Sequence, residues 1–118
     1  MSFSEILKDV VRKVDGSTGL FIIASDGIPV EGYVKENTVD ESALSAEFSA
    51  VLKTLHFALD NLQFGSIDEF SISTERYNIV VRKITSEYYL VLIMEPSSNI
   101  GKGRFYLRVT APKIEKEI

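Results

Sequence analysis

The sequence of 118 residues contains no cysteine, one histidine and three prolines. Without cysteine the chain can form neither a disulfide framework nor a thiolate metal site, and this absence fits a reducing compartment. A Ser-His-Asp triad would depend on the single histidine, His56. The chain also has no nucleophile-elbow motif to supply the serine of such a triad. We therefore expect no hydrolytic active site.

Long apolar runs and an excess of positive charge are also missing. Lysine and arginine number 13 against 17 acidic residues, and the net charge of −4 argues against a nucleic-acid partner. No apolar run approaches the roughly 20 residues of a membrane-spanning helix, and the first residues do not have the pattern of a signal peptide. We expect one cytoplasmic domain over residues 1–118, without membrane insertion.

One stretch, residues 38–64, has the pattern of a long helix. Thr38 suits an N-cap that forms a capping box with Glu41, and Gly65 suits the C′ position. At about 100° per residue, seven apolar side chains fall on one stripe that should pack on the core. These are Leu44, Phe48, Val51, Leu52, Leu55, Leu59 and Leu62.

The opposite side of this helix carries Ala43, Ala46, Ala50, Lys53 and Phe57. Their alternating intervals of three and four are typical of a seam between two helices. Alanine alone could reflect helix propensity on a solvated face. Phe57 is different, because burying such a side chain is worth about 1.5–3 kcal/mol, although single exposed aromatics are common. We predict that this side packs against a partner helix.

The remaining elements follow from shorter patterns. Residues 4–14 predict a helix capped by Ser2 or Ser4, and residues 20–24 and 28–34 predict two strands joined by a tight turn. Pro29 places the second strand at an edge. Residues 67–74, 77–84 and 88–94 predict three more strands. Of these, residues 67–74 should lie near the rim and residues 88–94 at the centre.

The last predicted helix begins at residue 100, with Ser98 or Asn99 as its cap, and should end or kink near Ala111 because Pro112 follows. The element order favours an α+β fold, a five-stranded antiparallel sheet with helices on both faces.

Few residues suggest chemistry. His56 and Asp60 lie four positions apart and could touch as a surface pair. The segment around Lys102, Gly-Lys-Gly, lacks the spacing of a phosphate-binding loop. Arg76, in a turn, could reach a phosphate as an arginine finger does, but charged turns are common. We expect no catalytic residue, no cofactor and no metal, and hence not an enzyme.

Three segments together resemble the Roadblock / dynein light chain family. They are STGLFIIASDGIPVEGYV, LSAEFSAVLKTLHFAL and YYLVLIMEPSSNIGKGRFYLR. The resemblance rests on an Asp-Gly-hydrophobic-Pro hairpin, the long helix, and an asparagine-hydrophobic-glycine start of the last helix. It covers nearly the whole chain.

The resemblance implies a profilin-like sheet of order 2-1-5-4-3, with the long helix on one face and the terminal helices on the other. It also implies homodimers or heterodimers joined through the third strand, with the long helices packed together. The dimer candidates are Ala43, Ala46, Ala50, Phe57, Phe70, Ser71, Ile72 and Ser73. An unpaired edge strand is otherwise open to unwanted association.

In function, the resemblance implies a non-catalytic module that binds a small Ras-like GTPase, as the bacterial MglB-type activators do. The GTPase would lie across paired long helices and contact Lys53, Thr54 and Asp60. Two alternatives stay open. One is a scaffold subunit without a nucleotide-dependent partner, and the other is a small-molecule-sensing domain, for which the Val-, Ile- and Leu-rich strands offer little polar lining.

Overall fold

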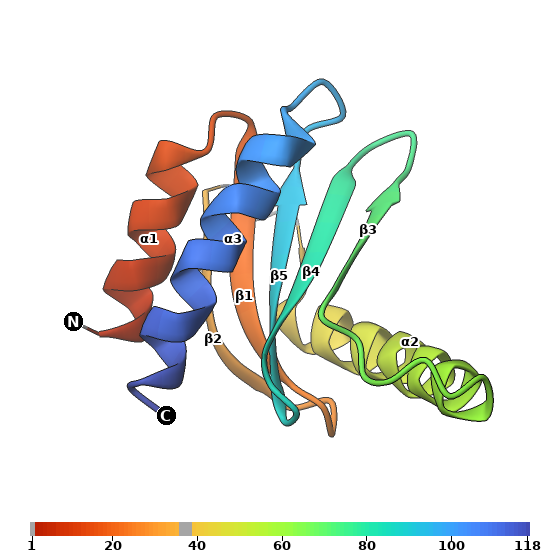
Figure 1. Cartoon of the computed structure of the whole chain (residues 1–118). Helices are drawn as coiled ribbons and strands as arrows, with labels where there is room; N and C mark the ends of the chain where they lie inside the picture. Colours follow the sequence, from red (N-terminus) through yellow and green to blue (C-terminus); the bar gives the residue numbers. More distant parts are fainter. Residues whose placement is uncertain (1, 36–38) are drawn as a thin grey trace.

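The computed structural model describes residues 2–35 and 39–118, which form three helices and five strands (Figure 1). The first half contains α1 (Phe3–Lys13), β1 (Ser17–Ala24), β2 (Pro29–Val34) and α2 (Glu41–Asn61). The second half contains β3 (Glu69–Ser73), β4 (Asn78–Thr85), β5 (Tyr88–Met94) and α3 (Ile100–Glu115). Within the described ranges, no helix combines the length and apolar character needed to cross a bilayer.

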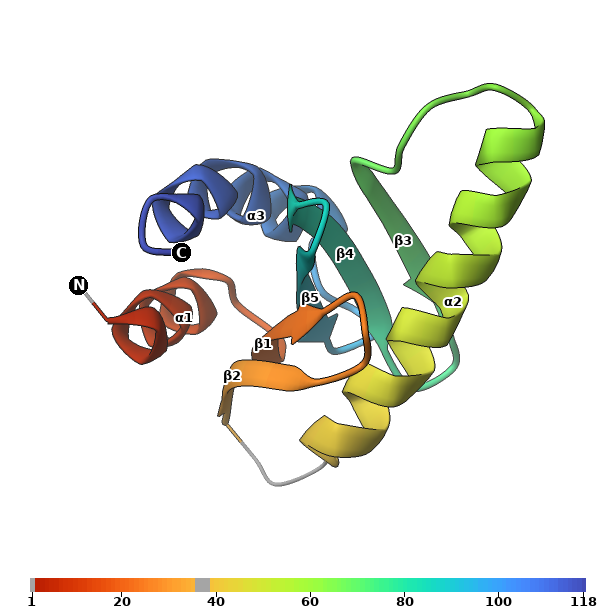
Figure 2. The ribbon, with the colours of Figure 1, turned by 90° about the horizontal axis from the view of Figure 1, so that it is seen from below.

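The five strands form one antiparallel sheet of order β2-β1-β5-β4-β3, as the family resemblance implies. The apolar β5 lies at the centre and pairs with β1 and β4. The two strands predicted at the rim, β2 and β3, are the edges. Figure 2 shows α1 and α3 on one face of the sheet and α2 on the other, so each face has its own apolar core.

The ends of α2 differ from the predicted ones. Asp40 is the N-cap, and its Oδ1 accepts hydrogen bonds from the backbone N–H groups of Ser42 (2.9 Å) and Ala43 (3.2 Å). The predicted cap Thr38 lies outside the described residues.

At the C-terminus of α2, the structure corrects the prediction that Gly65 occupies C′. The backbone N–H of Phe64 donates to the Leu59 carbonyl at 3.0 Å, and that of Gln63 donates to the Asp60 carbonyl at 3.1 Å. This is the Schellman pattern, with Gln63 in the left-handed conformation at φ 57. The helix therefore ends two residues earlier than a glycine-based cap would place it.

The last helix extends beyond Ala111, near which the sequence predicted an end or a kink. It continues through Pro112 to Glu115, although a proline inside a helix removes one hydrogen bond and costs about 3 kcal/mol. Ile114, beyond the proline, is fully buried in the core between α1, α3 and the sheet. Burying such a side chain contributes about 1.5–3 kcal/mol, which offsets most of the cost. Asn99 is the cap, accepting from the Lys102 N–H at 3.1 Å.

Candidate protein-binding surface

The inner side of α2 packs on the sheet through Leu44, Ser45, Ser49 and Leu52. Three other members of the predicted stripe, Phe48, Leu55 and Leu59, are half-buried against the same core.

Val51 and Leu62 were predicted to be buried but are exposed by 38% and 58%. The helix is rotated about its axis toward Ser49, because the turn after β1 approaches it closely there. A Cβ on Gly27 in that turn would lie only 3.0 Å from Ser49 Oγ. Leu62 lies at the C-cap, where α2 projects past the sheet (Figure 2).

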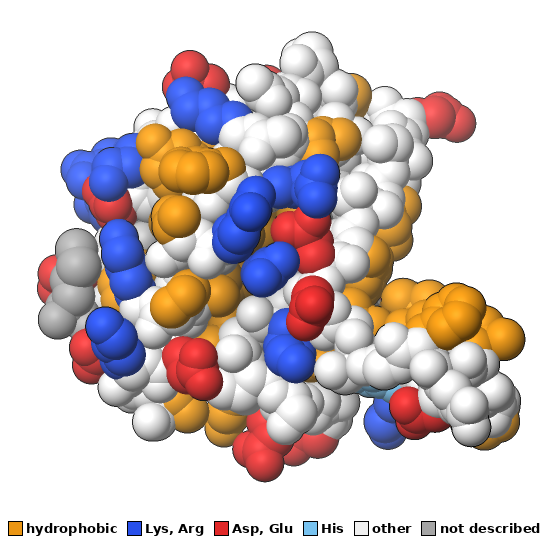
Figure 3. All heavy atoms as spheres, viewed as in Figure 1, with side chains coloured by type: hydrophobic (Ala, Val, Ile, Leu, Met, Phe, Trp, Pro, Cys, Tyr) orange, Lys and Arg blue, Asp and Glu red, His pale blue; other side chains and the backbone are white. Residues whose placement is uncertain are grey.

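The outer side of α2 is exposed along its whole length. Ala43, Ala46, Ala50 and Lys53 are all exposed, and Phe57 exposes 71% of its surface. Figure 3 shows hydrophobic atoms gathered on the projecting end of this helix. Exposed apolar surface of this kind marks an interaction site when several side chains contribute, and Leu62 and Phe64 (72% exposed) extend it. We call Ala43, Ala46, Ala50, Lys53 and Phe57 the α2 seam.

The edge strand β3 lies beside this helix. Phe70 packs partly against the core beneath α2, and Ile72 is also half-buried. Ser71 and Ser73 alternate with them and are exposed. On its inner side β3 pairs with β4, and among the described residues its outer edge has no strand partner. The predicted dimer residues therefore form two groups, the α2 seam and the β3 edge, on adjoining elements.

The predicted GTPase contacts also lie on α2. Lys53, Thr54 and Asp60 are exposed. The Thr54 hydroxyl donates to the Ala50 carbonyl at 3.2 Å, so it is already used within the helix. The role of all three in binding a partner stays a prediction.

The spacing of four residues allowed His56 to pair with Asp60. In the structure, the His56 side chain instead contacts the sheet. Its Nε2 lies 3.3 Å from the hydroxyl of Tyr89, a central β5 residue with only 1% of its surface exposed. This contact joins α2 to β5. Burial also raises the pKa of the Tyr89 phenol above its ordinary value of 10.0, because the charged phenolate is poorly solvated there.

This shift predicts a loss of stability at alkaline pH. The unfolded chain ionises Tyr89 at a lower pH than the folded protein, so the stabilisation is fully present below pH about 10 and is lost as pH rises through the folded pKa. Tyr89→Phe should therefore flatten the fall in unfolding free energy above about pH 10, measured by urea titration. Tyr106→Phe, on the other face of the sheet, is the control. An equal alkaline fall in Tyr89→Phe and wild type would contradict this prediction.

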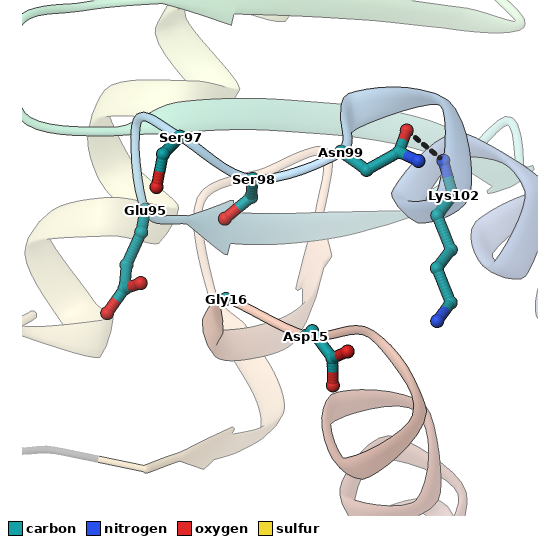
Figure 4. Close-up of a pocket in the computed structure, with 7 residues that line it drawn as sticks. All are labelled: Asp15, Gly16, Glu95, Ser97, Ser98, Asn99 and Lys102. Atoms are coloured by element: carbon teal, nitrogen blue, oxygen red, sulfur yellow. Dashed lines mark hydrogen bonds between the residues drawn. The ribbon is translucent and has the colours of Figure 1, made fainter.

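A cavity of about 380 Å³ opens at the start of α3 (Figure 4). It is lined by Asp15, Gly16, Glu95, Ser97, Ser98, Asn99 and Lys102. Gly16 is required there, because its φ is +85 and a Cβ would lie 2.0 Å from Ser98 Oγ. The carboxylates of Asp15 and Glu95 disfavour a phosphate beside Lys102. The Gly-Lys-Gly segment is instead explained in part by packing, because a Cβ on Gly103 would lie 2.8 Å from Met94 Sδ.

The part of the chain that the structure describes holds no group of three His, Cys, Asp or Glu side chains placed to bind a metal. The exposed α2 seam and the outer edge of β3 are the candidate surfaces that the sequence predicted for a protein partner.

Comparison with known proteins gives the family. A family model described as "Mitogen-activated protein kinase kinase 1 interacting" matches residues 1–103. Among curated proteins, none matches the sequence. The crystal structure of MglC from Myxococcus xanthus is 35% identical, with 100% of both chains covered and a TM-score of 0.72.

Two more distant solved structures share the fold. A Roadblock/LC7 domain from Streptomyces avermitilis has a TM-score of 0.89 at 10% identity, with 99% of this chain and 98% of that chain covered. MglB from Myxococcus xanthus has a TM-score of 0.85 at 13% identity, with 98% and 96% covered.

The family model and the solved structures carry different descriptions, but they cover the same elements. The match to residues 1–103 spans all five strands and the first turn of α3, and the Roadblock/LC7 and Mgl structures span nearly the whole chain. The chain therefore belongs to the family described as mitogen-activated protein kinase kinase 1 interacting, is related to MglC and shares the fold of Roadblock/LC7 domains.

Proposed function

We propose that this chain is a non-catalytic module that self-associates and binds a small Ras-like GTPase, which it regulates or localises. The observation that carries the proposal is Phe57, which is 71% exposed in line with three alanines on a helix next to the edge strand β3. The relationship to MglC and MglB adds the GTPase pathway as its expected setting.

Self-association through β3 would join two sheets edge to edge. Because α2 lies beside β3, such pairing would bring the two α2 helices together on one face of the joined sheet (Figure 2). The small side chains of Ala43, Ala46 and Ala50 would permit the 8–10 Å approach of packed helices. Phe57 and the half-buried Phe70 would lose their contact with water. Pairing would also satisfy the open edge of β3.

The GTPase would bind across the paired helices, where Lys53 of the α2 seam and the neighbouring Thr54 and Asp60 would provide polar contacts. Hydrolysis would use the GTPase's own groups, and the module would act by favouring one arrangement of the switch segments. Regulation thus requires a different affinity for the GTP- and GDP-bound forms.

A second candidate function, an assembly subunit without a nucleotide-dependent partner, is favoured by one observation. Lys53 is the only charged residue among the five positions of the α2 seam. Interfaces between permanently associated chains are more apolar than those of transient complexes. A heterodimer with a second Roadblock-type chain would use the same surface.

The two functions are separated by binding measurements with the Ras-like GTPases of the same cell, each loaded with a GTP analogue or with GDP. We expect one GTPase to bind, with a preference for one nucleotide. The double variant Lys53→Glu/Asp60→Lys, which keeps the net charge, should weaken that binding about tenfold. Lys8→Glu/Glu117→Lys, exposed near the termini, is the matched control. Self-association without any GTPase binding would favour the assembly subunit and contradict the proposal.

A further inference from the structure

The outer side of α3 is a second exposed surface, and the proposed self-association does not use it. The buried side of this helix consists of Gly103, Leu107, Thr110, Ala111 and Ile114. Opposite them, Phe105 and Val109 expose 52% and 39% of their surfaces, and Pro112 is exposed as well. At about 100° per residue these three lie within about 60° of one another, so they form one apolar line along the helix.

Basic side chains flank this line on both sides. By helical position, Lys102 and Lys113 lie on one flank and Arg104 and Arg108 on the other. Figure 3 shows lysine and arginine side chains gathered over α1 and α3, around exposed hydrophobic ones. We call Lys102, Arg104, Phe105, Arg108, Val109, Pro112 and Lys113 the α3 outer surface.

The charge of this surface is opposite to that of the protein. α3 contains four basic residues and one acidic residue, Glu115, and thus has a net charge of +3. The whole chain carries −4, so the remaining residues carry −7. A local field of this kind attracts an acidic partner and orients it during association.

Most of these cations are available to a partner. Arg104 is bound to Glu69 of β3, which also contacts Arg82 of β4 at 3.5 Å. Lys102, Arg108 and Lys113 take part in no ion pair within residues 2–35 and 39–118. The aromatic anchor is also held in place, because the Phe105 ring meets Tyr106 edge-on, with centroids 5.4 Å apart and planes at 86°.

We propose that the α3 outer surface binds an acidic amphipathic helix of a partner protein. The partner's apolar side chains would cover Phe105 and Val109, and its carboxylates would pair with the lysines and arginines on both flanks. From Lys102 to Lys113 the surface extends about 17 Å, or three turns, which matches a helix of about 11–15 residues.

Two features favour a protein partner over an anionic lipid surface. Acidic side chains occur among the basic ones on this face (Figure 3), and an anionic bilayer would repel them. Glu115, exposed in the last turn of α3, is the acidic residue of this helix. The apolar line is also narrow, as expected for a helix-on-helix contact. Since α3 and α2 cover opposite faces of the sheet, one copy can bind this partner while its α2 seam and β3 edge are occupied (Figure 2).

The test uses the full chain and a fluorescein-labelled 15-residue helical peptide with leucine at alternating intervals of three and four and glutamate on both flanks. Fluorescence anisotropy should show binding that weakens with added salt. Arg108→Glu/Lys113→Glu should weaken peptide binding about tenfold, and Phe105→Ser should weaken this binding as well. Matched controls on the other face, Lys53→Glu and Phe57→Ser, should leave the peptide affinity unchanged.

A charge exchange makes the test sharper. A peptide with lysine in place of glutamate should bind Arg108→Glu/Lys113→Glu better than wild type. Equal affinity of the glutamate peptide for wild type and both α3 variants would overturn the proposal. It would also be overturned if vesicles containing phosphatidylserine bound the wild-type chain, lost binding in the same variants, and the peptide did not bind.

Discussion

Phe57→Glu should convert the self-associated protein into a folded monomer. The side chain is 71% exposed in the single chain, so the core does not depend on it. In the proposed dimer it is buried in both copies, and each burial contributes about 1.5–3 kcal/mol. Losing both contributions and placing two carboxylates near each other should weaken self-association by at least about a hundredfold.

The measurement is light scattering or sedimentation of the purified chain over a range of concentrations. Phe105→Glu is the matched control, because Phe105 is an exposed aromatic on the other face of the sheet. This variant should leave self-association intact and weaken only the binding of the acidic peptide. If Phe57→Glu stays dimeric while Phe105→Glu becomes monomeric, the self-association interface lies on α3 and the proposed arrangement is wrong.

The sheet could be predicted from the sequence because its signals are local. The run from Tyr88 to Met94 is apolar throughout, as a strand covered on both faces must be, and it became the central β5. Because Pro29 cannot donate a backbone hydrogen bond, the sequence placed its strand at an edge of the sheet, and β2 is an edge strand. The order of the strands was predicted only from the family resemblance, because the residue pattern of one strand does not determine which strands pair with it.

The errors occur where tertiary contacts decide. Periodicity placed Val51 and Leu62 on the buried side of α2, but the approach of the turn at Gly27 rotates the helix toward Ser45 and Ser49. No hydrophobic pattern marks these two serines. Pro112 was predicted to end or kink α3, but the helix continues to Glu115, with Ile114 buried beyond the proline.

The sequence predicted a partner surface along the α2 seam because Phe57 is out of place on an otherwise small and polar side, and the structure shows these residues exposed. The α3 outer surface was missed, although its signal was present. Phe105 and Val109 are four residues apart with basic residues on both flanks, and neither fits the buried stripe through Leu107 and Ile114. A second amphipathic side on a helix that already has a buried one is a useful signal for a binding surface.

The largest loss of stability is expected for Leu52→Ala. Leu52 is the most buried apolar residue of α2, with 1% of its surface exposed, and it packs in the core between α2 and the sheet. Removing it should cost about 2–5 kcal/mol in unfolding free energy, because the sheet beneath α2 cannot collapse into the space. Truncating the half-buried Leu55 to alanine should lower the unfolding free energy by less.

Urea titration in the Phe57→Glu background measures this effect without a contribution from self-association. Val51→Ala is the matched control, one residue away on the same helix but 38% exposed, and it should cost less than about 1 kcal/mol. The order of the two losses tests the rotation of α2 directly. If Val51→Ala destabilised the monomer as much as Leu52→Ala, the helix would pack through the side that periodicity alone predicts, and the rotation described here would be wrong.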